Sequence, residues 1–159
     1  MKNQQKLRSI VTAVLIGCFA TGVSARDVFQ VDAVENSVSG GVGLDTGILV
    51  TKGQLLTINA NTADRWNIDP DPVYLCNANG EGNPFGKEQK PTTIPNIDFS
   101  FLNGTLIGSL DDGKTFFPIG IHSEQTIITD GALKLYMWDT DNTNNSGKIT
   151  VDVAVYNRN

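Results

Sequence analysis

Apolar and polar residues alternate along the last segment of the chain. Between residues 149 and 156, isoleucine or valine occupies every second position, and mostly polar or small residues lie between them. A period of two predicts a β-strand, because successive side chains point to opposite faces of a sheet. The face that carries only β-branched residues is expected to pack on a core, as in a strand of an antiparallel sandwich.

Short apolar segments of strand length recur through the rest of the chain. Turn signals separate them, among them Lys52-Gly53, Asn103-Gly104 and Asp130-Gly131, and Asn-Gly is the strongest dipeptide signal for a tight hairpin. No window repeats apolar residues at the spacing of a helical face. The predicted strands lie within residues 48–50, 55–60, 99–102, 105–110, 126–128 and 133–138. This pattern predicts an all-β fold, either a β-sandwich or a jelly roll.

Residues 61–97 differ from the rest of the chain. They hold five of the six prolines and show no convincing strand pattern. So long a loop is unusual in a compact domain, and such loops are commonly functional or disordered. We therefore expect a long loop between two of the strands.

The N-terminus has the layout of a secretory signal peptide. Residues 1–8 carry the cations, residues 10–23 are apolar or small, and small residues precede a cleavage point after Ala25. The apolar stretch is too short for a membrane span. Residues 1–25 are therefore predicted to be a signal peptide, so the protein is expected to be exported and to be secreted, periplasmic or at the cell surface.

A second interpretation of the same region stays open. Leu15-Ile16-Gly17-Cys18 resembles a bacterial lipobox, in which the signal would end at residue 17 and Cys18 would carry a lipid anchor. In both cases residues 26–159 are predicted to form a single domain. A domain of that length is large enough to bury a core.

Charge argues against two classes of partner. After removal of residues 1–25, nine Lys and Arg residues remain against seventeen Asp and Glu residues, which gives a net charge of −8. An acidic domain repels nucleic acid and anionic membrane surfaces. We therefore expect neither of them to be a partner.

Signals for catalysis are weak. His122 is the only histidine and lies outside any nucleophile motif, which favours a surface or packing role. Cys76, the only cysteine after the signal region, is expected to be a small buried residue. Asp69 and Asp71 have the chemistry of a glycosidase acid and base, but the prolines beside them favour turns. A hydrolase that uses Asp69 or Glu81 stays as an alternative.

Side chains that end in oxygen-bearing groups are concentrated between two predicted strands. Residues 138–147 read WDTDNTNNSG, with seven consecutive carboxylate, amide or hydroxyl side chains from Asp139 to Asn145. Calcium takes about six to eight oxygen ligands, and a short loop of this kind supplies several. The spacing is not that of an EF-hand, because Asn144 stands where that loop needs glycine and Thr150 where it needs glutamate. Local composition therefore leaves a solvated turn and a calcium site equally open.

Three blocks of sequence occur in a fixed order between residues 28 and 157. Residues 45–58 contain Asp-Thr-Gly-Ile and Lys-Gly-Gln-Leu-Leu-Thr-Ile, and residues 104–120 contain Leu-Ile-Gly followed by Phe-x-x-Gly. Residues 133–147 read LKLYMWD, a spacer of four, and NNSG, before the alternating last strand. Together these blocks resemble the PA-IL-like (LecA-type) calcium-dependent galactose-binding lectin family.

The resemblance implies a jelly-roll β-sandwich with one calcium ion at its surface. By position, Asp139, Asn144 and Asn145 match the side-chain ligands. Asp141 and Trp66 match positions that provide backbone carbonyl ligands. Two vicinal hydroxyl groups of the bound sugar would complete the shell, since calcium tolerates variable coordination.

The resemblance also implies the sugar contacts. Asp139 and Asn144 would hydrogen-bond the hydroxyl groups that reach the calcium, and Trp138 would either present its ring to the sugar or pack the sandwich edge. Residues 61–97 lack the histidine that contacts the sugar in the family, so the implied ligand is galactose or a related sugar. The expected function is non-catalytic carbohydrate binding, with homo-oligomers as in relatives. A structural or adhesive sandwich whose calcium only stabilises it is the alternative.

Overall fold

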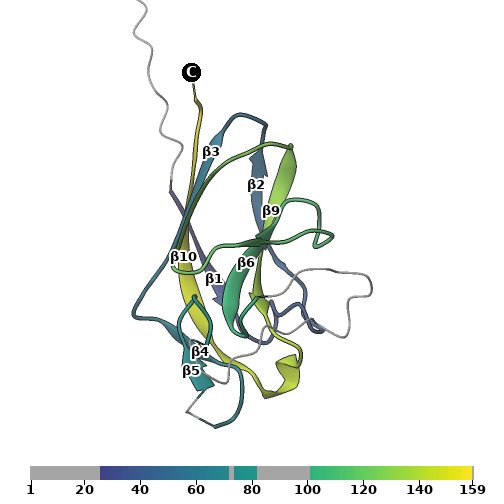
Figure 1. Cartoon of the computed structure of the whole chain (residues 1–159), viewed down its shortest axis with the longest axis vertical. Coiled ribbons are helices and arrows are strands. Elements are labelled where there is room, and N and C mark those ends of the chain that lie inside the picture. Colours follow the sequence, from purple (N-terminus) through teal and green to yellow (C-terminus); the bar gives the residue numbers. More distant parts are fainter. Residues whose placement is uncertain (1–25, 72–73, 82–100, 159) are drawn as a thin grey trace, which may run out of the picture.

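Two antiparallel β-sheets form the fold (Figure 1), and the computed structural model describes residues 26–71, 74–81 and 101–158. The strands of the six-stranded sheet are β1 (Asp27–Asp32), β3 (Leu55–Ala60), β4 (Arg65–Asn67), β5 (Leu75–Cys76), β8 (His122–Thr126) and β10 (Ser146–Tyr156). Those of the four-stranded sheet are β2 (Leu44–Val50), β6 (Thr105–Ser109), β7 (Phe117–Pro118) and β9 (Gly131–Trp138). The strand orders are β5-β4-β10-β3-β8, with β1 also paired to β10, and β2-β9-β6-β7.

The core lies between the two sheets. Alternate residues of β10 face it, and Val153 pairs with Ile58 of β3 within the six-stranded sheet. From the other sheet, β9 supplies Leu133, Leu135 and Met137, none of which exposes any surface. Each strand thus contributes one apolar face to a shared interior, which is how a sandwich buries enough hydrocarbon to be stable.

The β-sandwich prediction is confirmed, and so are most of the predicted strands. Residues 55–60 are β3, residues 48–50 end β2, and residues 133–138 lie within β9. The last alternating segment lies within β10, and β6 stops one residue before the predicted end at residue 110. A turn forms at Asn103-Gly104, where the N–H of Thr105 donates to the carbonyl of Leu102 at 3.1 Å, but the predicted hairpin does not, because β6 pairs with β7 and β9 and Leu102 lies outside any strand.

Several sequence expectations were wrong in detail. The segment 61–97 contains two short strands, β4 and β5, although it shows no strand pattern. Residues 126–128 do not form a strand: β8 ends at Thr126, Ile127 turns into the core and Ile128 is 80 % exposed. Strand β1 was not predicted. Strands β4 and β5 are too short to show a period, and β1 lies at the edge of the sheet, where it pairs with β10 and packs Phe29 and Val31 on the core.

Some predictions fall outside the described residues. The signal peptide at 1–25, the lipobox cysteine at residue 18, the segment 82–97 and residues 99–100 of the predicted hairpin all do so. Within the part of the chain that the structure describes, no helix has the length and apolar character needed to cross a membrane.

Gly104→Ala is expected to lower the free energy of unfolding by about 2–4 kcal/mol. Gly104 has φ of 76°, and a Cβ added there would lie 2.5 Å from Sγ of Cys76. The change therefore adds a clash to backbone strain. Urea denaturation measures the loss. Gly53→Ala is the matched control, because Gly53 has φ of 94° and a Cβ added there would meet nothing within 4 Å. Equal losses at both positions would contradict the packing argument.

Candidate functional site

The oxygen-rich loop connects β9 to β10 at one end of the sandwich. Trp138 ends β9, and Ser146 begins β10. Strand β4 pairs with the first residues of β10, so β4 and β5 lie at the same end, opposite to the C-terminus (Figure 1). This arrangement brings the loop next to residues that are about 70 positions earlier in the chain, such as Trp66, which pairs with Gly147.

A short 3-10 helix, η2 (Asn142–Asn144), shapes the loop. Asp141 caps it, since Oδ1 of Asp141 accepts hydrogen bonds from the N–H of Thr143 at 3.0 Å and from its hydroxyl at 2.6 Å. These bonds hold the pKa of Asp141 below its usual value. The side-chain carboxylate of Asp141 is therefore occupied by the turn. The backbone carbonyl of Asp141 remains the predicted calcium ligand.

Asp139 carries a buried carboxylate that is only partly paired. Its residue is 3 % exposed, and its Oδ1 accepts from the N–H of Thr140 at 2.7 Å, but Oδ2 has no partner. Burial raises the pKa of Asp139 above its ordinary value, although neighbouring N–H groups and the amide of Asn145 oppose the shift. A buried carboxylate oxygen without a partner is costly, so this position calls for a cation or a hydrogen-bond donor.

Asn144 and Asn145 present two more unpaired oxygens. Asn145 is 7 % exposed, and its Nδ2 donates to the carbonyl of Ala33 at 3.1 Å and contacts Sδ of Met137 at 3.5 Å. These contacts set the orientation of the amide, so its Oδ1 is directed away from them and has no partner. Oδ1 of Asn144 is likewise buried and unpaired.

The three unpaired oxygens belong to the three residues that were predicted to be side-chain ligands. All are hydrogen-bond acceptors, and carboxylate and amide oxygens are the ligands that calcium prefers. Among the described residues, no group of three or more His, Cys, Asp or Glu side chains could hold a metal ion. The nearby thiol of Cys76 is also unsuited to a soft metal, because burial raises its pKa to about 12, with the charge of Asp139 adding to the effect. The residues present therefore fit a hard cation such as calcium.

Trp66 lies where its main chain can reach the loop. Its side chain is fully buried, and its Nε1 donates to the carbonyl of Gly104 at 2.8 Å. Its backbone pairs with Gly147, two residues after Asn145. The carbonyl ligand predicted at Trp66 stays a prediction that this placement supports.

Trp138 does not line a sugar site in this structure. It exposes none of its surface, and its ring makes edge contacts with Phe101 at a centroid distance of 5.0 Å and with Phe116 at 5.9 Å. These residues belong to a second apolar cluster on the outer face of the four-stranded sheet. The packing alternative therefore describes the position of Trp138, and a sugar contact by its ring stays a prediction.

The residues weighed for catalysis are engaged in local structure. Oδ1 of Asp69 accepts from the N–H of Asp71 at 3.0 Å, which is the turn geometry that the prolines favoured. His122 lies on β8, where its Nδ1 and Oδ1 of Asn59 are 2.7 Å apart. The N–H of Glu81 donates to the carbonyl of Asn103 at 2.8 Å.

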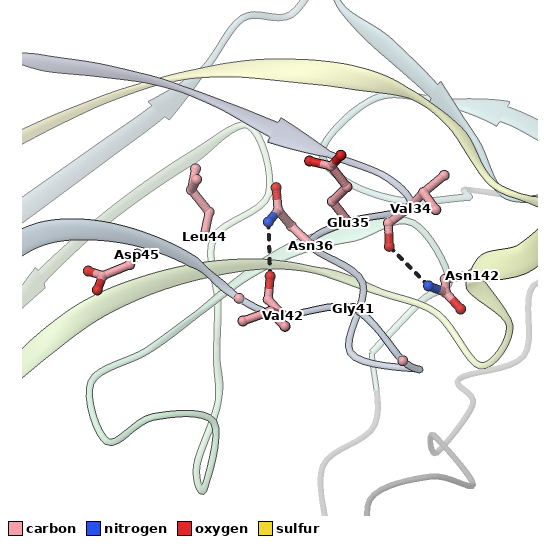
Figure 2. Close-up of a pocket in the computed structure, with 10 residues that line it drawn as sticks. Val34, Glu35, Asn36, Gly41, Val42, Leu44, Asp45 and Asn142 are labelled. Carbon is pink, nitrogen blue, oxygen red and sulfur yellow. Dashed lines mark hydrogen bonds between the residues drawn. The ribbon is translucent and has the colours of Figure 1, made fainter.

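The segment directly after β1 holds the β9–β10 loop in place, and no sequence pattern pointed to it. The amide of Asn142 donates to the carbonyl of Val34 at 3.0 Å, as Asn145 does to Ala33. Figure 2 shows a surface pocket of about 520 Å³ that the Asn142–Val34 bond borders, lined by residues of the 34–45 segment and by Asn142. The partners are more than 100 residues apart in sequence, so no local pattern could have linked them.

Comparison with known proteins identifies a shared fold. No protein-family model matches the chain, and no curated protein sequence does. A solved structure described as "EclA N-terminal domain; PllA-like lectin" superimposes with a TM-score of 0.56 and 23 % identity, over 82 % of this chain and 95 % of that one. The chain therefore has the β-sandwich fold of a PllA-like lectin domain.

Proposed function

We propose that the protein binds carbohydrate through a calcium ion held in the β9–β10 loop. The observation that carries this proposal is the set of unpaired, buried oxygens on Asp139, Asn144 and Asn145. The likeness to a lectin domain supports it. The ligand proposed is galactose or a related sugar, and the function is binding without catalysis.

The chain's own residues would hold the ion and orient the sugar. Asp139 supplies the negative charge, and the amide oxygens of Asn144 and Asn145 complete the side-chain set, with the carbonyls of Asp141 and Trp66 as further ligands. Ala33 positions Asn145, because its carbonyl accepts from Nδ2 of Asn145 and so leaves Oδ1, rather than the NH2 group, to face the ion. When bound, calcium supplies coordination positions that two vicinal hydroxyl groups can fill.

A single site of this kind binds weakly. Few atoms of a monosaccharide contact the protein, so useful avidity needs several sites on one particle. We therefore extend the proposal to homo-oligomers that are exported through the signal peptide predicted at residues 1–25.

The proposal predicts that calcium stabilises the protein and switches on glycan binding. At a calcium concentration about a hundredfold above Kd, stability should rise by about 2.7 kcal/mol, because only the folded state holds the site. That gain corresponds to a rise in Tm of roughly 5–15 °C. Isothermal titration with CaCl2, thermal unfolding and a glycan array, each repeated in EDTA, measure the three effects. No calcium uptake, or glycan binding that persists in EDTA, would contradict the proposal.

The same experiment separates the structural alternative. The loop joins the two sheets and is tied back to Ala33 through Asn145, so an ion there could serve stability alone. In that case calcium would raise Tm, and the glycan array would be flat both with calcium and with EDTA.

A further inference from the structure

We propose that Asn67 and Asn103 form the sugar-contacting wall of the same site. Their amide oxygens would accept hydrogen bonds from hydroxyl groups of the sugar that do not reach the calcium. This inference rests on the proposed function and adds two specificity-determining residues to it.

Unpaired buried oxygens gather at this end of the sandwich. Seven buried side-chain polar atoms have no hydrogen-bond partner within the part of the chain that the structure describes. Five of them belong to three neighbouring segments, and all five are oxygens: Oδ1 of Asn67, Oδ1 of Asn103, Oδ2 of Asp139, Oδ1 of Asn144 and Oδ1 of Asn145. Unpaired buried polar atoms are rare in proteins, so their concentration here indicates a ligand rather than chance.

Hydrogen bonds connect the three segments. Asn67 pairs with Ser146, the residue that follows Asn145. The N–H of Gly104 donates to the carbonyl of Trp138 at 2.7 Å, which brings Asn103 beside the start of the loop. The side chain of Trp66, next to Asn67, reaches the carbonyl of Gly104 at 2.8 Å. Asn67 and Asn103 therefore flank the loop that carries Asp139.

The chemistry of these oxygens favours hydroxyl donors. Calcium takes about six to eight ligands, and the proposed shell of three side chains, two carbonyls and two sugar hydroxyls already satisfies it. The amide oxygens of Asn67 and Asn103 are then left to accept hydrogen bonds. Nδ2 of Asn67 donates to the carbonyl of Asp71 at 3.3 Å, which orients its Oδ1 away from that carbonyl. A sugar supplies several hydroxyl donors around one ring, so a pyranose is the ligand class that fits.

The test compares Asn67→Ala and Asn103→Ala with Asn157→Ala. Asn157 is exposed and lies beyond the end of β10, far along the strand from the loop, so its replacement is the matched control. Each purified protein is titrated with CaCl2, and then, in saturating calcium, with methyl galactoside and its monodeoxy analogues. If another monosaccharide ranks first on the glycan array, that sugar and its analogues are used.

We expect each variant to keep calcium affinity within about twofold and to lose about five- to tenfold in sugar affinity, the worth of one hydrogen bond. One deoxy analogue should bind the variant and the wild type equally, because the analogue already lacks the hydroxyl that the amide contacts. A purely structural role would weaken all analogues in parallel.

Three results would overturn the inference. They are unchanged sugar affinity, a parallel loss for every analogue, and a loss of calcium affinity of about tenfold or more, which would make the residue a metal ligand. If the wild type takes up calcium but binds no sugar, the proposed function fails together with this inference. If the wild type binds sugar and both variants bind it as well, only the inference fails.

Discussion

Replacing Asp139 with alanine is expected to abolish calcium-dependent glycan binding and to reduce calcium affinity by at least about a hundredfold, equivalent to about 2.8 kcal/mol. Asp139 is the only carboxylate among the three residues with unpaired oxygens at the proposed shell. Its removal takes away the only charged side chain of the proposed coordination shell, and ligand charge is a main determinant of calcium affinity. Titration calorimetry and a glycan array in calcium measure both effects.

The effect of replacing Asp139 on the free energy of unfolding should depend on calcium. In EDTA the wild type keeps a buried carboxylate oxygen with no partner, which costs free energy that alanine does not. Asp139→Ala and Asp139→Asn should therefore be at least as stable as the wild type in EDTA and less stable in calcium. Urea denaturation in the two buffers would show this crossing.

A matched control removes the same charge elsewhere. Asp27 is exposed at the start of β1, so Asp27→Ala should change neither calcium affinity nor the response to EDTA. If Asp139→Ala still takes up calcium as the wild type does, the site is misplaced. If it loses calcium but the wild type never binds glycans, the calcium is structural.

Replacing Trp138 with alanine is expected to lower the free energy of unfolding by about 3–5 kcal/mol. The side chain is fully buried, and it packs edge-on against Phe101 and Phe116. Its loss would open a cavity in the outer apolar cluster and remove two aromatic contacts. Because domains of this kind are stable by about 5–15 kcal/mol, the variant should still fold at low temperature, where urea denaturation can be measured.

Sugar binding by this variant tests whether Trp138 only packs the sheet. If the ring only packs the sheet, the folded variant in calcium should bind glycans with an affinity close to that of the wild type. Trp138→Phe should recover part of the lost stability, since it refills most of the cavity. If the Trp138→Ala protein is folded and binds calcium but no longer binds sugar, the ring of Trp138 contacts the sugar.

Strands were predicted correctly where one face is buried in the core and the other is more exposed to solvent. Strands β3 and β10 alternate in burial as they do in hydropathy, so the period of two identified them. Strands β4 and β5 have only three and two residues, too few for any period to be seen. Edge strand β1 was missed for a related reason, because only Phe29 and Val31 of its six residues pack on the core, which is too short an alternation to stand out in the sequence.

The composition of residues 139–145 was enough to predict a loop rich in calcium-type ligands, and the order of the sequence blocks was enough to predict a lectin-like sandwich. Which oxygens lack partners was decided only by the fold, because burial and hydrogen bonding depend on segments such as Ala33 and Gly104 that are distant in sequence. The burial of Trp138 was likewise decided only by the fold. Periodicity tells which residues share a face of β9, but the cover that Val38, Phe101 and Phe116 place over that face is set by tertiary packing.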